Sequence, residues 1–225
     1  MRYSQMRLPL ILLLGCLTAS VSASELTQKE IDDWFNGPSQ STANVNEGDL
    51  VFLAQKPAKA VHHHHNTLTL NRESLAEGWA QLEQCHENID KVPRAQILFN
   101  LSKIKDLRIT SYSNIEQAWV EGPSVQLKNV TSGAKLCVAA QSRALTKTGE
   151  NSYTLKNGPF MRRFLDGYYP MHVSMTVKLA DNNLVLASVS PQEQPGFVVR
   201  RTPNQVDIDA WFEGRLNTEL RFNGR

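Results

Sequence analysis

The sequence predicts a mainly β protein: an antiparallel β-sandwich or open barrel with one docked helix and a short N-terminal helix. Long stretches alternate apolar and polar residues with a period of two, which is the spacing of a half-buried strand. Gly, Pro, Asn and Asp residues separate these stretches, and helical spacing is confined to two short segments. An α+β arrangement is the alternative class.

Residues 1–23 have the three-part layout of a secretory signal. Arg2 and Arg7 precede an apolar run, and small residues lead up to Ala23. The apolar run is about half of the roughly 20 residues that span a bilayer, so we expect cleavage after Ala23 and a secreted or periplasmic protein without a transmembrane segment. The alternative is cleavage before Cys16 and lipidation of that cysteine, which the bulky Leu14 fits less well.

Charge depends on whether this leader is removed. The chain has 24 Lys and Arg against 22 Asp and Glu, and residues 1–23 contain Arg2, Arg7 and no acid. The mature chain therefore has 22 of each and is neutral, which excludes bulk electrostatic attraction to nucleic acid. An anionic partner must be recognised by a local patch of positive charge.

The cysteines predict a disulfide. Of the three cysteines, Cys16 is removed or lipidated, and this leaves Cys85 and Cys137. An even pair in an exported protein is most simply a disulfide. Two buried free thiols are the alternative.

Residues 24–47 are predicted to be a short helix and a linker ahead of a single mainly β domain over 48–225. Thr27 and Glu30 form a capping box, and Gly37-Pro38 ends the helix. Within the domain, 49–53 is a strand candidate and 55–65 reads as an exposed loop.

The docked helix is predicted over 75–89. Ser74 and Glu77 form a second capping box, and apolar residues recur at spacings of three and four as far as Ile89. This helix places Cys85 on its core-facing stripe, from which it reaches Cys137 on a strand.

The later segments alternate as strands do. Residues 171–179 and 184–189 flank Asp181-Asn182-Asn183, which predicts a hairpin. Residues 206–222 alternate around Gly214, where we expect a bend or a hairpin because a straight strand of that length does not fit a small domain. A hairpin loop over 213–215 would keep the apolar face continuous.

A run of histidines is the most unusual motif, and it predicts copper or zinc binding as the alternative function. Neighbours on a strand point to opposite faces, so all four cannot reach one ion from a rigid strand, whereas two of them could do so from a mobile loop. A solvated loop without a metal is the other interpretation. The candidate metal ligands are His62, His63, His64, His65 and His86.

Residues 159–170 combine arginines with aromatic side chains and predict a binding loop for an anionic group. Arginine pairs with carboxylates in a bidentate manner, and tyrosine offers a stacking face. The alternative is that the aromatic rings fill the core while the arginines cap carbonyls. The candidate ligand-binding residues are Arg162, Arg163, Tyr168 and Tyr169.

Enzyme signatures such as G-x-S-x-G, H-E-x-x-H, the P-loop and G-x-G-x-x-G are missing from the chain. The sequence therefore predicts first a non-catalytic module of the cell envelope, without a cofactor, that binds an envelope component or a protein partner. Periplasmic metal binding through the histidine run is the second prediction.

Overall fold

The computed structural model describes residues 46–164, 167–180 and 184–224. The predicted signal segment, Cys16, the helix predicted near Thr27 and the turn at 181–183 lie outside the described residues.

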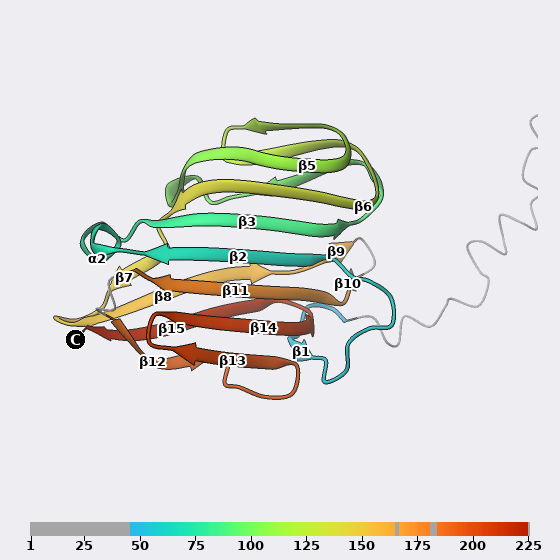
Figure 1. Cartoon of the computed structure of the whole chain (residues 1–225). Coiled ribbons are helices and arrows are strands. Elements are labelled where there is room, and N and C mark those ends of the chain that lie inside the picture. The colour runs from blue at the N-terminus through green and yellow to red at the C-terminus, as the bar shows by residue number, and fades with distance from the viewer. Residues whose placement is uncertain (1–45, 165–166, 181–183, 225) are drawn as a thin grey trace, which may run out of the picture. The chain divides into compact units, whose positions relative to one another are not determined.

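The described chain is mainly β-structure, in three sheets (Figure 1). The largest is a nine-stranded sheet with the order β1-β14-β11-β2-β3-β6-β4, to which β13 adds beside β14 and β5 beside β6. Its strands are β1 (Val51–Phe52), β2 (His63–Leu70), β3 (Ala80–Ile89), β4 (Val92–Leu98), β5 (Ile104–Glu121), β6 (Ser124–Ser142), β11 (Met171–Leu179), β13 (Phe197–Thr202) and β14 (Gln205–Glu213).

A four-stranded sheet has the order β12-β15-β8-β7, and β9 pairs with β10 in a small separate ribbon. The elements are β7 (Leu145–Lys147), β8 (Ser152–Phe160), β12 (Leu184–Ser190), β15 (Leu216–Gly224), β9 (Arg163–Phe164) and β10 (Gly167–Tyr168). The helical elements are α2 (Arg72–Glu77) and the 3₁₀ turn η2 (Leu101–Lys103).

The prediction of a mainly β protein is confirmed. The strand pairs are antiparallel except β2 with β11, which run parallel. The sheets stay open over the described ranges, with no closed barrel among them. None of the helices described is long and apolar enough to cross a membrane.

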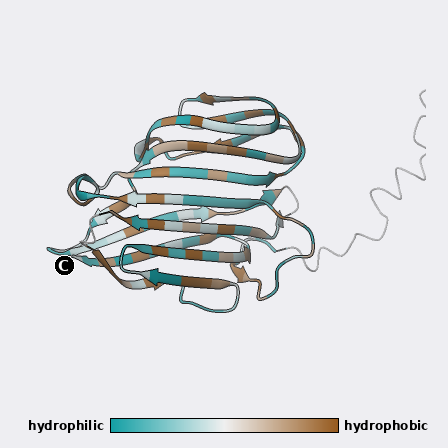
Figure 2. Ribbon diagram, in the orientation of Figure 1, coloured by the Kyte–Doolittle hydropathy of each residue, from teal (hydrophilic) through white to brown (hydrophobic). Residues whose placement is uncertain are grey.

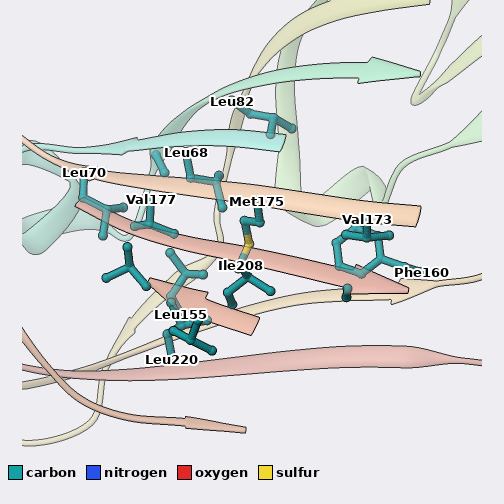
Figure 3. Close-up of a cluster of buried hydrophobic side chains, with 14 of the residues drawn as sticks. Leu68, Leu70, Leu82, Leu155, Phe160, Val173, Met175, Val177, Ile208 and Leu220 are labelled. Carbon is teal, nitrogen blue, oxygen red and sulfur yellow. The ribbon is translucent and has the colours of Figure 1, made fainter. Parts of the chain in front are cut away.

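The four-stranded sheet packs against the part of the nine-stranded sheet that contains β2, β11 and β14. Apolar and polar residues alternate along these strands (Figure 2), so one face of each sheet is apolar. Leu155 of β8 and Leu220 of β15 meet Ile208 of β14 in the shared core (Figure 3). A second apolar cluster lies along β6, around Leu127 and Leu136.

The helix predicted over 75–89 is wrong for most of its length. Helix α2 begins after Asn71, whose side chain accepts a hydrogen bond from the backbone of Ser74, and it ends at Gly78. Gly78 has a left-handed φ of 83°, which favours glycine and terminates the helix. Strand β3 follows, because alternate residues from Leu82 to His86 are buried while those between them lie on the other face. A spacing of four between apolar residues fits both one helix turn and two repeats of a strand, and the pattern therefore predicts a helix where the chain forms a strand.

The hairpin predicted from residues 171–179 and 184–189 is wrong, because the two strands lie in different sheets. Strand β11 belongs to the nine-stranded sheet, whereas β12 pairs with β15 in the four-stranded sheet. Strand β14 likewise lies in the large sheet and β15 in the small one. The bend predicted at Gly214 is present, but Phe212 and Leu216 are not strand partners. The alternation runs through the bend unbroken because both sheets turn the same side of the chain toward the shared core.

The disulfide between Cys85 and Cys137 is confirmed. The two residues are directly opposite each other on β3 and β6. Both are half-buried on the outer face of the nine-stranded sheet, so the predicted core-facing position of Cys85 is wrong. His65 of β2 is the other strand partner of Cys85.

Replacing both cysteines, as C85S/C137S, is expected to lower the free energy of unfolding. The bond closes a loop between residues 52 apart in the sequence, which corresponds to about 4 kcal/mol in the chain-entropy model. Urea unfolding of the two proteins measures the loss, with wild type in reductant as the control. Equal midpoints for the variant and the oxidised wild type contradict the prediction.

Replacing Gly214 by alanine is expected to destabilise the corner between β14 and β15. Its φ is +87°, and an added Cβ would overlap the backbone oxygen of Asp49. We expect a loss of at least about 2 kcal/mol in the free energy of unfolding, measured by urea denaturation. Gly122→Ala is the matched control, because Gly122 also has a positive φ but has open space around it. A loss no larger than that of Gly122→Ala argues against the steric explanation.

Candidate functional site

The histidine run is divided by the alternation of strand β2. Residues His63–His65 lie within the strand, so the exposed loop predicted over 55–65 is wrong at this end. His64 faces the inner side of the sheet, toward the four-stranded sheet, and His62 shares that side. His63 and His65 lie on the outer side, where both contact Ser174. The four imidazoles therefore form two separate sites.

The inner histidines form a hydrogen-bonded group with two carboxamides. His64 Nε2 lies 2.7 Å from Asn66 Oδ1, and His62 Nε2 lies 2.9 Å from His86 Nδ1. Gln84 Nε2 lies 2.7 Å from His86 Nε2. An amide nitrogen only donates, so His86 Nε2 accepts, and the remaining proton of the neutral ring sits on Nδ1 and is donated to His62. This places a fixed pattern of donors and acceptors on the inner wall.

Burial keeps these imidazoles neutral. It lowers the pKa of His64 to about 3 and that of His62 to about 4, and it lowers the pKa of His86 well below its ordinary value. For His62, the nearby carboxylate of Asp90 acts in the opposite direction but does not offset the desolvation. At neutral pH the inner wall therefore offers uncharged donors and acceptors.

Register divides the inner face of β2 and β3 into a polar half and an apolar half. His64 lies opposite His86, and Asn66 lies opposite Gln84. The next inward pair is Leu68 with Leu82, which belongs to the shared core. The exposed fractions of the four polar residues are 9%, 4%, 2% and 6%, so they are buried as deeply as their apolar neighbours.

A cavity of about 890 Å³ lies between this polar wall and the four-stranded sheet. Strands β8 and β15 supply the opposite wall, and the segment from the end of β4 to the start of β5 closes a third side. Phe160, at the end of β8, packs edge-on against His64, with 4.9 Å between the ring centroids. The volume is within the range of cavities that hold small organic ligands.

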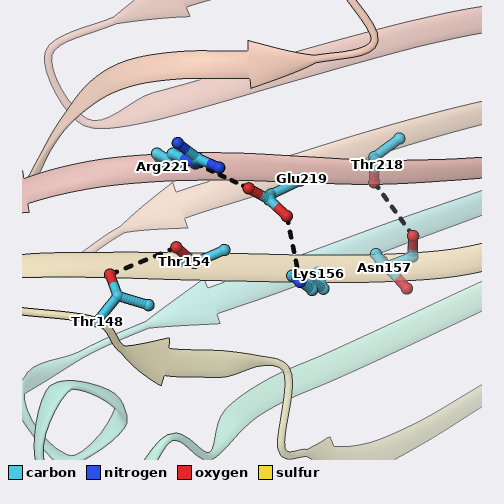
Figure 4. A network of polar contacts seen from close by, with 7 residues as sticks. All are labelled: Thr148, Thr154, Lys156, Asn157, Thr218, Glu219 and Arg221. Carbon is cyan, nitrogen blue, oxygen red and sulfur yellow. Dashed lines mark hydrogen bonds and ion pairs between the residues drawn. The ribbon is translucent and has the colours of Figure 1, made fainter.

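Strands β8 and β15 also carry polar contacts (Figure 4). Lys156, Glu219 and Arg221 alternate with core residues along these strands, so their side chains lie on the face turned away from the shared core. Lys156 Nζ lies 3.2 Å from Glu219 Oε2, and Arg221 binds the other oxygen of Glu219 at 2.8 Å. Thr218 donates to the backbone oxygen of Asn157. The carboxylate of Glu219 is thus already satisfied by two cations.

The outer face holds the other half of the histidine run. The imidazoles of His63 and His172 stack with centroids 3.9 Å apart, and His172 stacks on Trp211 at 4.0 Å. His172 Nε2 lies 3.1 Å from Asp209, and this hydrogen bond is the main cause that lowers the pKa of Asp209. The parallel pairing of β2 with β11 creates this arrangement.

Metal binding by the histidine run stays a prediction. Over the part of the chain that the structure describes, no three His, Cys, Asp or Glu side chains are grouped so that they could hold a metal ion. Cys85 is also unavailable as a ligand, because its sulfur is in the disulfide.

The predicted arginine loop lies beside the inner histidines. Arg162 donates to both carboxylate oxygens of Asp90, at 3.0 and 2.6 Å, so its charge is neutralised within the fold. Tyr168 is buried between Arg163 and Arg215, whose guanidinium groups lie over its ring. Tyr169 packs against Phe164. A binding role for Arg162, Arg163, Tyr168 and Tyr169 stays a prediction.

Sequence reasoning missed Asn66 and Gln84, the carboxamides of the cavity wall. Their alternation with outward residues could have revealed them, because each occupies an inward position of a strand that also has leucines at inward positions. For Gln84 this signal was hidden by the helix prediction.

No protein-family model matches the chain, and no curated protein sequence matches it. A structural likeness is found to the crystal structure of a two-domain M1 zinc metallopeptidase mutant bound to L-tryptophan. The two share 10% sequence identity and a TM-score of 0.36 over 80% of this chain, which spans 44% of the metallopeptidase chain. A likeness this loose carries no inference about fold or activity.

Acid is expected to destabilise the fold through the inner histidines. The folded pKa of His64 is about 3 against an ordinary 6.5, so between these values the unfolded chain binds the extra proton. Stability is therefore full above pH 6.5 and falls as the pH drops, by about 1.4 kcal/mol per pH unit for each such histidine. Urea unfolding at pH 7.5 and pH 5 measures the loss, which should be about 2 kcal/mol smaller in His64→Gln. The same loss in this variant and in wild type contradicts the assignment.

Proposed function

We propose that this chain is an exported, non-catalytic binding protein whose ligand is a small polar molecule held in the cavity between the two packed sheets. The observation that carries the proposal is the row of buried polar side chains, His64, Asn66, Gln84 and His86, on the cavity wall. The fold serves as a β-sandwich scaffold for this site.

The energetics of the polar row support a binding role. A buried polar group costs about 1–3 kcal/mol when it lacks a partner, and even when it is hydrogen-bonded it adds less than apolar packing. Leu68 and Leu82 occupy the next register pair of the same two strands, so the backbone accepts an apolar pair at this face. Polar residues at the Asn66–Gln84 pair are therefore not required for folding, and recognition of a ligand explains them.

The cavity suits binding better than catalysis. Its lining histidines are hydrogen-bonded to each other and to carboxamides. Among the described residues that line it, Glu219 is the one carboxylate, and its side chain is turned away from the shared core and paired with Lys156 and Arg221. This arrangement holds neutral hydrogen-bonding groups in place and offers no acid or base poised beside a nucleophile.

Export is part of the same proposal. The predicted signal segment and the disulfide on the outer face are both consistent with an oxidising compartment such as the periplasm or the cell exterior. In that setting the protein meets small solutes and components of the cell envelope, and these are the ligands that we propose for it.

A thermal-shift panel of sugars, amino acids and organic acids tests the cavity as the binding site. At a concentration of about 100 times its Kd, a true ligand is expected to raise the Tm of the wild type by about 5–10 °C. The variant N66L/Q84L, which extends the Leu68–Leu82 pair, is expected to fold and to lose this shift.

The matched control is T67V/E83Q, because Thr67 and Glu83 are partners on the same two strands but face away from the cavity. It should keep the full shift. A ligand that shifts N66L/Q84L as much as the wild type binds elsewhere, and this outcome rejects the cavity.

A further inference from the structure

Among the residues that the structure describes, two cations that line the cavity have no acidic partner. Lys103 ends the turn η2, and Arg143 follows β6. The backbone nitrogen of Arg143 donates to the oxygen of Lys103 at 2.9 Å, which holds the two residues side by side. Both are exposed, so they mark a side of the cavity that opens to solvent.

Their charges are unbalanced within the fold. Over the described ranges, neither Lys103 nor Arg143 forms an ion pair, whereas the third lining cation, Lys156, pairs with Glu219. The lining thus contains three cations and one carboxylate, since the histidines are neutral. Because the mature chain has equal numbers of acids and bases, this positive charge is local.

The inner wall recognises a different kind of group. Imidazole and carboxamide side chains each donate and accept hydrogen bonds, so together they match hydroxyl groups, which also do both. Phe160 adds an aromatic ring at the same wall, beside His64. A body rich in hydroxyls fits this wall better than a purely apolar one.

We infer that the cavity binds an acidic saccharide, with its hydroxyls against His64, Asn66 and Gln84 and its carboxylate between Lys103 and Arg143. The inference rests on the proposed function and names the ligand class of the same site. Arginine pairs a carboxylate through a planar fork, and lysine adds a point charge beside it. The anionic group is thus recognised by a local cation pair in a neutral protein.

Calorimetric titration with trigalacturonic acid and with its full methyl ester tests the inference. The two probes share their sugar rings and hydroxyls, and the ester replaces each carboxylate by a neutral methyl ester. Wild type is expected to bind the acid roughly tenfold more tightly or better, because hydrogen bonds to charged groups are the strong ones. Added NaCl should weaken binding of the acid and leave the ester unchanged.

The variant K103Q/R143Q is expected to lose the preference for the acid and to keep the affinity of the wild type for the ester. Lys178→Gln/Arg201→Gln removes the same two residue types from exposed positions outside the cavity lining and should change neither affinity. Far-UV circular dichroism and Tm confirm that both variants are folded.

The other outcomes contradict either recognition of the anion or binding in the cavity. Equal binding of acid and ester, or a preference that survives in K103Q/R143Q, rejects recognition of the anion. If N66L/Q84L still abolishes binding in that case, the cavity itself stands. If neither probe binds the wild type, an acidic saccharide is not the ligand. The proposed binding function is then tested separately by the thermal-shift panel.

Discussion

The packing of the four-stranded sheet on the nine-stranded sheet is the contact on which the rest of the structure depends. It buries one face of the four-stranded sheet against the part of the nine-stranded sheet that contains β2, β11 and β14, and Leu155 and Leu220 meet Ile208 in this core. The chain must turn a corner where it passes from β14 in the large sheet to β15 in the small one. This corner requires Gly214 at a positive φ, close to the backbone of Asp49. Once the sheets are stacked, it is settled which side of β2, β11, β14, β8 and β15 faces the core.

The cavity is a consequence of the same packing. The inward leucines of β2 and β3, Leu68 and Leu82, belong to the shared core and also border the cavity of about 890 Å³. The polar residues His64, Asn66, Gln84 and His86 continue the same wall of the cavity along these two strands. Neutral imidazoles are stable there because desolvation opposes their protonation, so the wall keeps its hydrogen-bonding pattern at neutral pH.

Much of the local structure was predictable, and the errors have physical causes. The predominance of strands, the disulfide between Cys85 and Cys137 and the bend at Gly214 follow from periodicity, cysteine count and chain length. The error at 75–89 arose because a spacing of four residues fits a helix turn and two strand repeats equally. The hairpin errors arose because the alternation of apolar and polar residues shows which side of a strand faces the core. It does not show which other strand pairs with it.

The sequence by itself determined the class of fold, the residues that alternate along each strand and the pair of cysteines that bond. Each of these depends on neighbours along the chain or on the number of available partners. Only the tertiary structure decided that His62 and His64 lie in a cavity while His63 stacks on His172, and that Lys103 lies beside Arg143. These residues are far apart in the sequence, and they come together only through the order of the strands and the stacking of the sheets. Burial of the whole apolar core determines that order and stacking.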